Sequence, residues 1–303
     1  MTAQPLLAVD APSLYFRAFH GIPEKAAQTS AGEPVNAIRG FLDMLAQLIR
    51  TRHPDRLVCA LDASWRPAWR VALVPSYKKH RVAHGDVEEV PATLKPQIPI
   101  LLEALSAIGI PAFGVDGYEA DDVLGTLAAT QPGPVEVVSG DRDLFQLVDD
   151  ARGTRLLYCG RGVAKLEDAD NALVEQKYGV PARFYADFAA MRGDPSDGLP
   201  GVPGVGDKTA ARLITRYGGV AEILAALDDP DAGFAPGVRT KLAASTGYLA
   251  KALPVCKVAL DVKLPEFDPA LPRTPKDPDA LLALAERWNL AGSARRLVDA
   301  LAG

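Results

Sequence analysis

The stretch LLAVDAPSLYFRAFHG, residues 6–21, begins with a short apolar run that ends on an acidic residue, Asp10. Similar apolar runs recur through the first half of the chain, at residues 57–61, 111–115, 135–139 and 154–158. Longer segments with helical patterning separate them, and this alternation is typical of βαβ units. We therefore predict an α/β fold with a mostly parallel sheet flanked by helices.

Apolar residues spaced three and four positions apart predict the helices between these strands. One helix is predicted between the first two strands from the set Ile38, Phe41, Leu42, Leu45, Leu48 and Ile49. A second is predicted over residues 98–108. We place its start near Pro99, because proline is tolerated only in the first turn of a helix.

The second half of the chain has a different pattern. From about Asp168 onward the strand signals stop and helical patterns dominate, punctuated by glycine and proline. Five prolines between Pro265 and Pro278 predict a stiff connector, which leads to a last helical segment at residues 279–301. We therefore predict an α/β domain over residues 1–175 and a helical domain over residues 176–303.

Composition leaves the function class open but restricts the surroundings. The 303 residues are 48% hydrophobic and 23% charged, as in ordinary globular proteins. No apolar run is long enough to span a bilayer, and we expect no secretory signal and a cytoplasmic protein. Cys59, Cys159 and Cys256 lie far apart, which disfavours a zinc site or a disulfide framework. The net charge of −5 does not exclude nucleic-acid binding, because the distribution of charge matters more than its sum.

Acidic residues follow the predicted strands at the point where each strand ends. In an open α/β sheet these ends share one edge, where ligands bind. A further pair lies in the first loop of the helical part. We therefore expect one cleft to gather Asp10, Asp62, Glu119, Asp121, Asp122, Asp141, Asp143, Asp194 and Asp197.

So many like charges raise one another's pKa unless cations neutralise them. Carboxylate oxygen is the preferred ligand of hard divalent cations, so the set favours Mg²⁺ or Mn²⁺ over zinc. Two such ions roughly 4 Å apart support phosphodiester cleavage. Taken singly, Asp121 is explained by the dipole of its helix and Asp143 by a helix cap, but the whole set is not.

These segments, in their order, resemble the 5′-nuclease family, which includes flap endonucleases and the N-terminal domain of bacterial DNA polymerase I. The matching stretches include LLAVDAPSLYFRAFHG, LDA, YKKHR, GYEADDVLGTLA, SGDRDLFQLV and MRGDPSDGLPGVPGVGDKTA. The resemblance implies a PIN-like nuclease domain whose nine carboxylates hold two divalent ions. It also implies a helical arch near residues 70–95 that admits a 5′ strand, with Tyr77 beside it and Lys79 on the DNA. Four basic residues match positions near the scissile phosphate: Arg17, Arg70, Lys78 and Arg81.

The segment GVPGVGDKTA has physical meaning of its own. Gly201, Gly204 and Gly206 permit a tight turn with outward backbone N–H groups, and we expect a helix to begin near Asp207. Lys208 adds positive charge. The segment resembles the family's helix–three-turn–helix near residues 194–217, which implies a duplex grip that includes Thr209 and a bound monovalent cation, K⁺.

Two departures from the family pattern concern loops. Gly198 stands where the family has Asn, and the segment ASWRPAWR after Asp62 differs in sequence and length. The resemblance implies flap endonuclease or 5′–3′ exonuclease action on DNA flaps, nicks or ends, or on RNA-containing 5′ strands, by a monomer working beside a polymerase and a ligase. The alternatives are a DNA-binding protein with weak catalysis and RNase H-like cleavage of RNA:DNA hybrids. An aspartyl phosphatase is disfavoured, since Asp10 is followed by Ala11 and Pro12.

Overall fold

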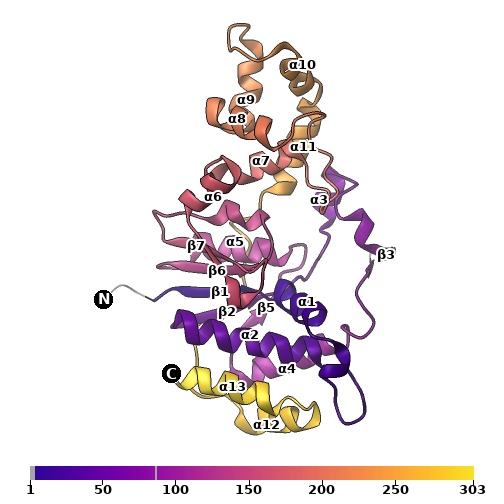
Figure 1. The fold of residues 1–303 in the computed structure, drawn as a ribbon, viewed down its shortest axis with the longest axis vertical. Coiled ribbons are helices and arrows are strands. Elements are labelled where there is room, and N and C mark those ends of the chain that lie inside the picture. Colours follow the sequence, from indigo (N-terminus) through magenta and orange to yellow (C-terminus); the bar gives the residue numbers. More distant parts are fainter. Residues whose placement is uncertain (1–3, 86) are drawn as a thin grey trace.

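The computed structural model describes residues 4–85 and 87–303. Its main sheet has the strand order β5-β2-β1-β6-β7-β8, in which only β8 runs antiparallel to its neighbour (Figure 1). The predicted mostly parallel α/β sheet is thereby confirmed. The strands are β1 Leu6–Asp10, β2 Arg56–Ala60, β5 Ala112–Phe113, β6 Val135–Ser139, β7 Thr154–Tyr158 and β8 Glu167–Ala169.

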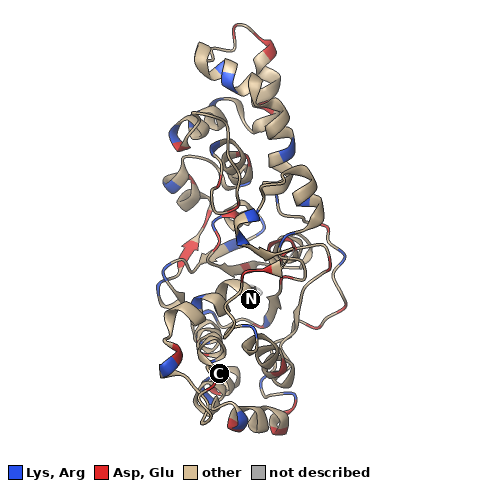
Figure 2. Cartoon of the chain, turned by 90° about the vertical axis from the view of Figure 1, so that its right-hand side faces the viewer, with Lys and Arg blue, Asp and Glu red and all other residues tan. Residues whose placement is uncertain are grey.

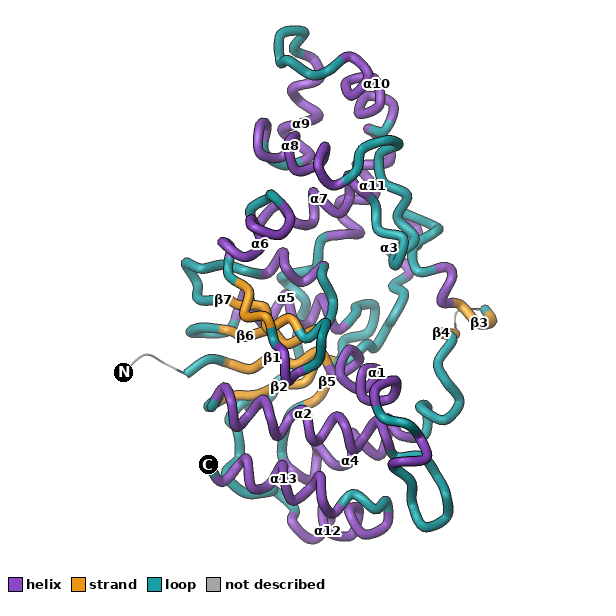
Figure 3. Tube along the Cα trace, in the orientation of Figure 1, coloured by secondary structure: helices purple, strands orange, loops and turns teal. Residues whose placement is uncertain are grey.

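The two faces of the sheet bury alternate residues of the central strand β1. Leu7 and Val9 pack in an apolar cluster with residues of α2 and α4, whereas Leu6 and Ala8 join a second cluster with α5 and the helical region. This period of two places helices on both faces of the sheet, as Figure 3 shows. The helices of this body are α1 Ala11–Gly21, α2 Asn36–Arg52, α3 Ala68–Leu73, α4 Gln97–Ile108 and α5 Ala120–Thr130.

The helical region follows β8 and stands above the sheet in Figure 1. An aromatic cluster joins it to the body, because the ring of Phe145 lies 5.6 Å from that of Tyr185 and 5.3 Å from that of Tyr178. Rings at these spacings stabilise an interface beyond their buried area. The helices are α6 Asn171–Tyr178, α7 Tyr185–Arg192, α8 Asp207–Tyr217, α9 Val220–Ala225, α10 Pro236–Ala244 and α11 Thr246–Cys256.

The C-terminal segment differs from its predicted grouping with the helical region. The proline-rich connector returns along β2, where the Leu57 N–H donates to the Pro269 carbonyl at 2.8 Å. Two helices follow, α12 Pro278–Arg287 and α13 Ala291–Ala302, with left-handed Asn289 between them. They pack on α4 and α2 (Figure 1), because the buried stripe of α13 completes the apolar layer on that face of the sheet.

A helical arch was predicted near residues 70–95, but the described part of this stretch is mostly not helical. Beyond the end of α3, the described part of this stretch contains one short 3₁₀ turn, Lys79–Arg81, and a small hairpin, β3 Val82–His84 with β4 Val87–Glu88. Pro75, Pro91 and the left-handed Gly85 interrupt any longer helix. We call residues 66–85 and 87–96 the strap, because they run beside the sheet from just before α3 to just before α4 (Figure 1).

Charge and hydropathy add little to this architecture. Lysine, arginine, aspartate and glutamate occur along the whole length of the molecule (Figure 2), so the binding face is identified from individual residues. Within the described ranges no helix is both long and apolar enough to cross a membrane. Cys59, Cys159 and Cys256 are buried free thiols.

Candidate active site

The carboxyl ends of β1, β2, β5 and β6 open into one cleft of about 230 Å³, which we call the carboxylate cleft. The sheet order explains this convergence, because these four strands are neighbours and their ends lie at the same edge. Five of the predicted carboxylates line the cleft: Asp10, Asp62, Glu119, Asp121 and Asp141.

Three further predicted carboxylates lie beside the cleft. Asp143 follows Asp141 by two residues, and the charges of Asp141, Asp194 and Asp197 all act on its carboxyl group. The Asp143 Oδ1 atom is buried and has no hydrogen-bond partner. A buried oxygen without a donor is costly, so its arrangement favours a cation at this position.

The electrostatics of the cleft are dominated by burial and mutual repulsion. Burial raises the pKa of Asp10 to about 7, although its Oδ2 accepts a hydrogen bond from the Ser139 hydroxyl at 2.5 Å. Burial and the nearby carboxylates raise the pKa of Asp121 and of Asp143 well above the ordinary aspartate value, and that of Asp197 to about 6. Burial and mutual repulsion therefore outweigh the opposite charges near these groups, including the Arg81 guanidinium 3.2 Å from Asp197.

The donor set fits divalent ions of the hard class. The acidic residues that line the cleft offer carboxylate oxygens, which suit Mg²⁺ or Mn²⁺. Among residues 4–85 and 87–303, no group of three His, Cys, Asp or Glu side chains is arranged so that it could hold a metal ion by itself. This open arrangement agrees with the chemistry of Mg²⁺, which keeps several waters and takes one or two carboxylates together with substrate phosphates.

Asp122 and Arg70 do not face the cleft, and their predicted roles as metal ligand and catalytic residue are not supported by this geometry. Arg70 is 2% exposed, and its two terminal nitrogens each bond one Asp122 oxygen at 2.7 Å. The Ala259 N–H also donates to Asp122, and Arg70 donates to the carbonyls of Val255 and Lys257. The pair therefore ties the strap to α5 and to the chain that leaves α11.

Tyr77 is likewise buried rather than exposed beside a DNA path. It is 3% exposed, and its hydroxyl donates to Glu119 at 2.7 Å. Lys78 also bonds Glu119, and its backbone N–H donates to the Asp197 carbonyl. Burial alone would lower the pKa of Lys78, but Tyr77, Glu119 and Asp197 raise it overall, which keeps the ammonium charged. Lys78 lines the cleft, so it brings a fixed positive charge to the edge of the site.

Two other predicted basic residues lie at the cleft, whereas Lys79 does not line it. Arg81 lines the cleft and donates to Asp197 at 3.2 Å. Arg17 lies beside the loop after β6, with one terminal nitrogen 3.1 Å from the place of a Cβ at Gly140. Lys79 is exposed on the strap. These positions place two guanidinium groups at or beside the carboxylates.

The departure at Gly198 has a structural reason. Gly198 has a φ of +72°, and a Cβ there would lie 2.2 Å from the Ser76 carbonyl oxygen. The strap therefore passes directly against the loop that carries Asp194 and Asp197. A glycine in place of asparagine permits this close approach.

The glycine hairpin is divided between buried and exposed residues. Gly204, Gly206 and Lys208 are exposed, and α8 begins at Asp207 as predicted. Thr209 is half-buried. Gly201 is buried instead, and its N–H donates to the Tyr248 hydroxyl at 2.9 Å, so it is not free to bind a phosphate.

The sequence analysis missed Lys241, which lies on α10 over the same hairpin. A Cβ placed at Gly204 would meet the Lys241 ammonium group, and the lysine is exposed. No sequence signal identifies it, because α10 is far along the chain and Lys241 lies in no motif. Its ammonium adds a second positive charge beside Lys208 at the hairpin.

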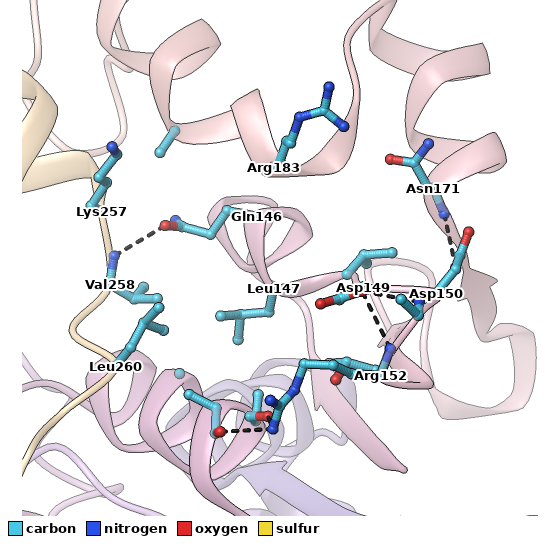
Figure 4. A pocket seen from close by; sticks show the side chains of 17 residues that line it. Gln146, Leu147, Asp149, Asp150, Arg152, Asn171, Arg183, Lys257, Val258 and Leu260 are labelled. Atoms are coloured by element: carbon cyan, nitrogen blue, oxygen red, sulfur yellow. Dashed lines mark hydrogen bonds between the residues drawn. The ribbon is translucent and has the colours of Figure 1, made fainter. Parts of the chain in front are cut away.

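Of the cavities described, the largest, of about 770 Å³, lies elsewhere, between α5, α7 and the segment after α11. Figure 4 shows Arg152 with its guanidinium turned toward the end of α5, where it donates to the Ala129 carbonyl at 2.7 Å. Asp149 accepts hydrogen bonds from its own loop. These polar groups are engaged in structural bonds, so cavity size does not identify the active site here.

Comparison with known proteins gives the family. The family model described as "5'-3' exonuclease, N-terminal resolvase-like domain" matches residues 5–179, and "5'-3' exonuclease, C-terminal SAM fold" matches residues 180–279. The chain belongs to the 5′–3′ exonuclease family. It is accordingly a nuclease, a hydrolase of phosphodiester bonds, and the predicted family resemblance is confirmed.

Members of the exonuclease family match along nearly the whole chain. A "5'-3' exonuclease" of Streptomyces coelicolor is 53% identical over 300 residues, which cover 97% of this chain and 99% of the relative. A DNA polymerase I of Mycobacterium tuberculosis is 36% identical over 98% of this chain, but the match covers 32% of the polymerase. The solved T5 5'-exonuclease with bound zinc has a TM-score of 0.65 at 18% identity and covers 98% of this chain and 99% of its own.

Proposed function

We propose that this protein is a structure-specific 5′ nuclease that cuts DNA at flaps, nicks or 5′ ends, as a flap endonuclease and a 5′–3′ exonuclease. The observation that carries the proposal is the carboxylate cleft, where Asp10, Asp121 and Asp141 lie together without a neutralising side chain bonded to them. The neighbouring hairpin supplies the second half of the argument, because it presents backbone N–H groups and lysines suited to a duplex.

Divalent ions, Mg²⁺ or Mn²⁺, are the proposed cofactors. Asp10, Asp62, Asp121 and Asp141 would hold them from the cleft, and Asp143, Asp194 and Asp197 would hold them from the side of the helical region. When bound, two such ions would lower the pKa of the attacking water and stabilise the charge that develops on the phosphate. Zinc in the T5 5'-exonuclease supports a metal site in this fold.

The basic residues of the cleft would orient the substrate. Lys78 is fixed by Glu119, so its remaining N–H donors are available to a phosphate at the cleft. Arg81, three residues further along the strap, is held by Asp197. A lysine acts on phosphate as a point charge and an arginine as a fork, and together they would position the scissile group. The role proposed for Arg17 is weaker contact with the adjoining phosphate.

The hairpin would hold the duplex without reading its sequence. Exposed Gly206 leaves room for a phosphate, and Lys208 and Lys241, whose ammonium group lies over Gly204, supply charge. A monovalent cation, K⁺, is proposed beside the hairpin backbone. T5 and Rad2 nucleases solved with DNA support a DNA substrate, and the match to DNA polymerase I supports work beside a polymerase. A ligase as a further partner and the cytoplasm as the location are part of the same proposal.

A cleavage assay tests the proposal. The substrates are 5′-labelled flap, nicked, RNA-ended, RNA:DNA hybrid and single-stranded oligonucleotides, each with Mg²⁺, Mn²⁺ or excess chelator. We expect cleavage near the flap junction and from 5′ ends, and none in chelator. Full activity in chelator would overturn the metal mechanism, and preferential cleavage inside RNA:DNA hybrids would favour the RNase H-like alternative. Sedimentation of the same sample tests the proposed monomer.

A further inference from the structure

A second cleft adjoins the carboxylate cleft on the side of the helical region. It has a volume of about 610 Å³ and shares Gly140 and Asp141 with the carboxylate cleft. We call it the side cleft. Its walls carry two arginines and a tyrosine that have no role in the site described above: Arg142, Arg192 and Tyr158.

Arg192 has unused hydrogen-bonding capacity in this cleft. It ends α7, its side chain is 15% exposed, and its guanidinium carbon lies 5.1 Å from the centre of the Phe188 ring. One terminal nitrogen meets Asp194 at 3.3 Å, whereas the buried Nε has no partner. An arginine offers five N–H donors, and leaving a buried one unpaired is costly unless a ligand supplies the acceptor.

Arg142 approaches the same space from the loop between β6 and the Asp143–Leu147 turn. It is exposed, and it lines the side cleft together with Tyr158. Tyr158 is itself held by the ring of Phe145, at 5.4 Å between centroids. Arg142 therefore lines the side cleft together with a fixed aromatic side chain.

The place of the side cleft decides what it would bind. Asp207, the first residue of α8, lines it at one end, and Asp141 of the carboxylate cleft lines it at the other. A strand that leaves the hairpin and enters the carboxylate cleft must cross it. Two guanidinium groups at such a crossing suit the anionic backbone of that strand, since arginine forks match phosphate oxygens.

We propose that the side cleft is a phosphate subsite in which Arg142 and Arg192 hold one backbone phosphate of the substrate strand, next to the scissile linkage on the duplex side. The inference rests on the proposed function, because it takes the substrate to be a duplex held at the hairpin. Asp141 and Asp194 in the same walls belong to the proposed ion-binding set, so bound cations offset their charge when substrate is present.

The test asks whether the two arginines and one particular phosphate contribute to the same binding interaction. The double variant Arg142→Met, Arg192→Met keeps the alkyl packing on Phe188 but removes both forks. Its control is Arg183→Met, whose guanidinium lies over Phe184 at 4.8 Å and which lines the largest cavity instead. Binding of a fluorescent 5′-flap duplex is measured by anisotropy with Ca²⁺ present, and a gel checks that the substrate stays intact. The cut site is first mapped with Mg²⁺. Neutral methylphosphonates then replace, one at a time, the first three linkages on the duplex side of that cut. If the protein makes no cut, the three linkages are counted from the flap junction instead.

We expect the double variant to bind about tenfold more weakly than the parent, with the salt slope reduced by about two ions' worth. At one of the three linkages, the methylphosphonate should weaken DNA binding by the parent and by the control, but should not weaken binding by the double variant any further. The subsite would be overturned if each of the three methylphosphonates weakened binding equally in the parent and in the double variant. It would also be overturned if the parent did not bind the flap duplex at all. If the parent cleaves DNA but the methylphosphonate effect is the same in the double variant, only the subsite is refuted. If that effect disappears in the double variant but no protein cleaves DNA, the phosphate site is supported and the nuclease mechanism is refuted. Equal thermal unfolding midpoints confirm that the variants fold.

Discussion

Two groups of acidic residues meet near the N-terminus of α5, and they are neutralised in different ways. Glu119 and Asp122 are buried and bonded by the protein's own Arg70, Tyr77 and Lys78. Asp121, one residue before Asp122, has no such partner, and burial and neighbouring carboxylates raise its pKa well above the ordinary value. The difference teaches that the protein's own basic side chains neutralise the carboxylates that stabilise the fold, which we call the balanced group. The carboxylates proposed to bind cations have no such partner, and we call them the unbalanced group.

The largest effect is expected from the unbalanced group. Asp141→Ala removes a carboxylate from the cleft and should lower the cleavage rate by at least about 100-fold, because ion charge stabilises the transition state. DNA binding should persist or tighten, since negative charge facing the phosphates is lost. Single-turnover cleavage and anisotropy measure the two effects. A variant that cuts at the parent rate would show that Asp141 holds no catalytic ion.

The balanced group should respond in stability. Arg70→Met leaves Asp122 and part of Glu119 buried without their cation, which costs about 3–5 kcal/mol of unfolding free energy. Asp122→Ala should be destabilised for the same reason, because Arg70 then loses both short bonds. Urea unfolding in chelator measures the change. If Arg70→Met unfolds like the parent and loses only activity, Arg70 acts on substrate and the comparison fails.

A pH series sharpens the comparison without mutation. The folded pKa of Asp10 is about 7, against an ordinary value of 3.8, so the folded state binds this proton more tightly than the unfolded state. Its contribution to stability is therefore lost as the pH rises from about 4 to 7. In chelator the unfolding midpoint should fall across this window, and Mg²⁺ or Mn²⁺ should restore it most at the higher pH. A metal-induced shift that does not grow with pH would contradict this account.

The smallest effect is expected at the hairpin, which belongs to neither group. Lys208→Ala and Lys241→Ala should each weaken duplex binding a few-fold and reduce the salt slope by about one ion's worth. Gly206→Val should do more, because the space there is open and the side chain would meet only the phosphate. Lys276→Ala, exposed beside α12, is the control. If the Lys241 variant matches this control, the lysine lies near the hairpin without serving it.

The sheet and the convergence of the carboxylates were predictable, because parallel strands carry their final residues to one edge. The separate fates of Asp121 and Asp122 were not. Adjacent residues on a helix point about 100° apart, and sequence does not say which of the two faces the cleft. The side cleft was not predicted from Arg142 and Arg192, because each lies in a motif whose pattern is set by its acidic residues. Prolines at positions 75 and 91 did carry a signal against a helical arch.

The return of the chain beside β2 has a mechanical consequence. The helical region is joined to the body twice, once after β8 and once through residues 257–270, where Asp122 and Arg70 hold the second crossing. A part attached at both ends cannot swing like a part on a single hinge. The hairpin is therefore held at a constant distance from the carboxylates. If it grips a duplex as proposed, the place of that grip would determine how many nucleotides away the cut falls.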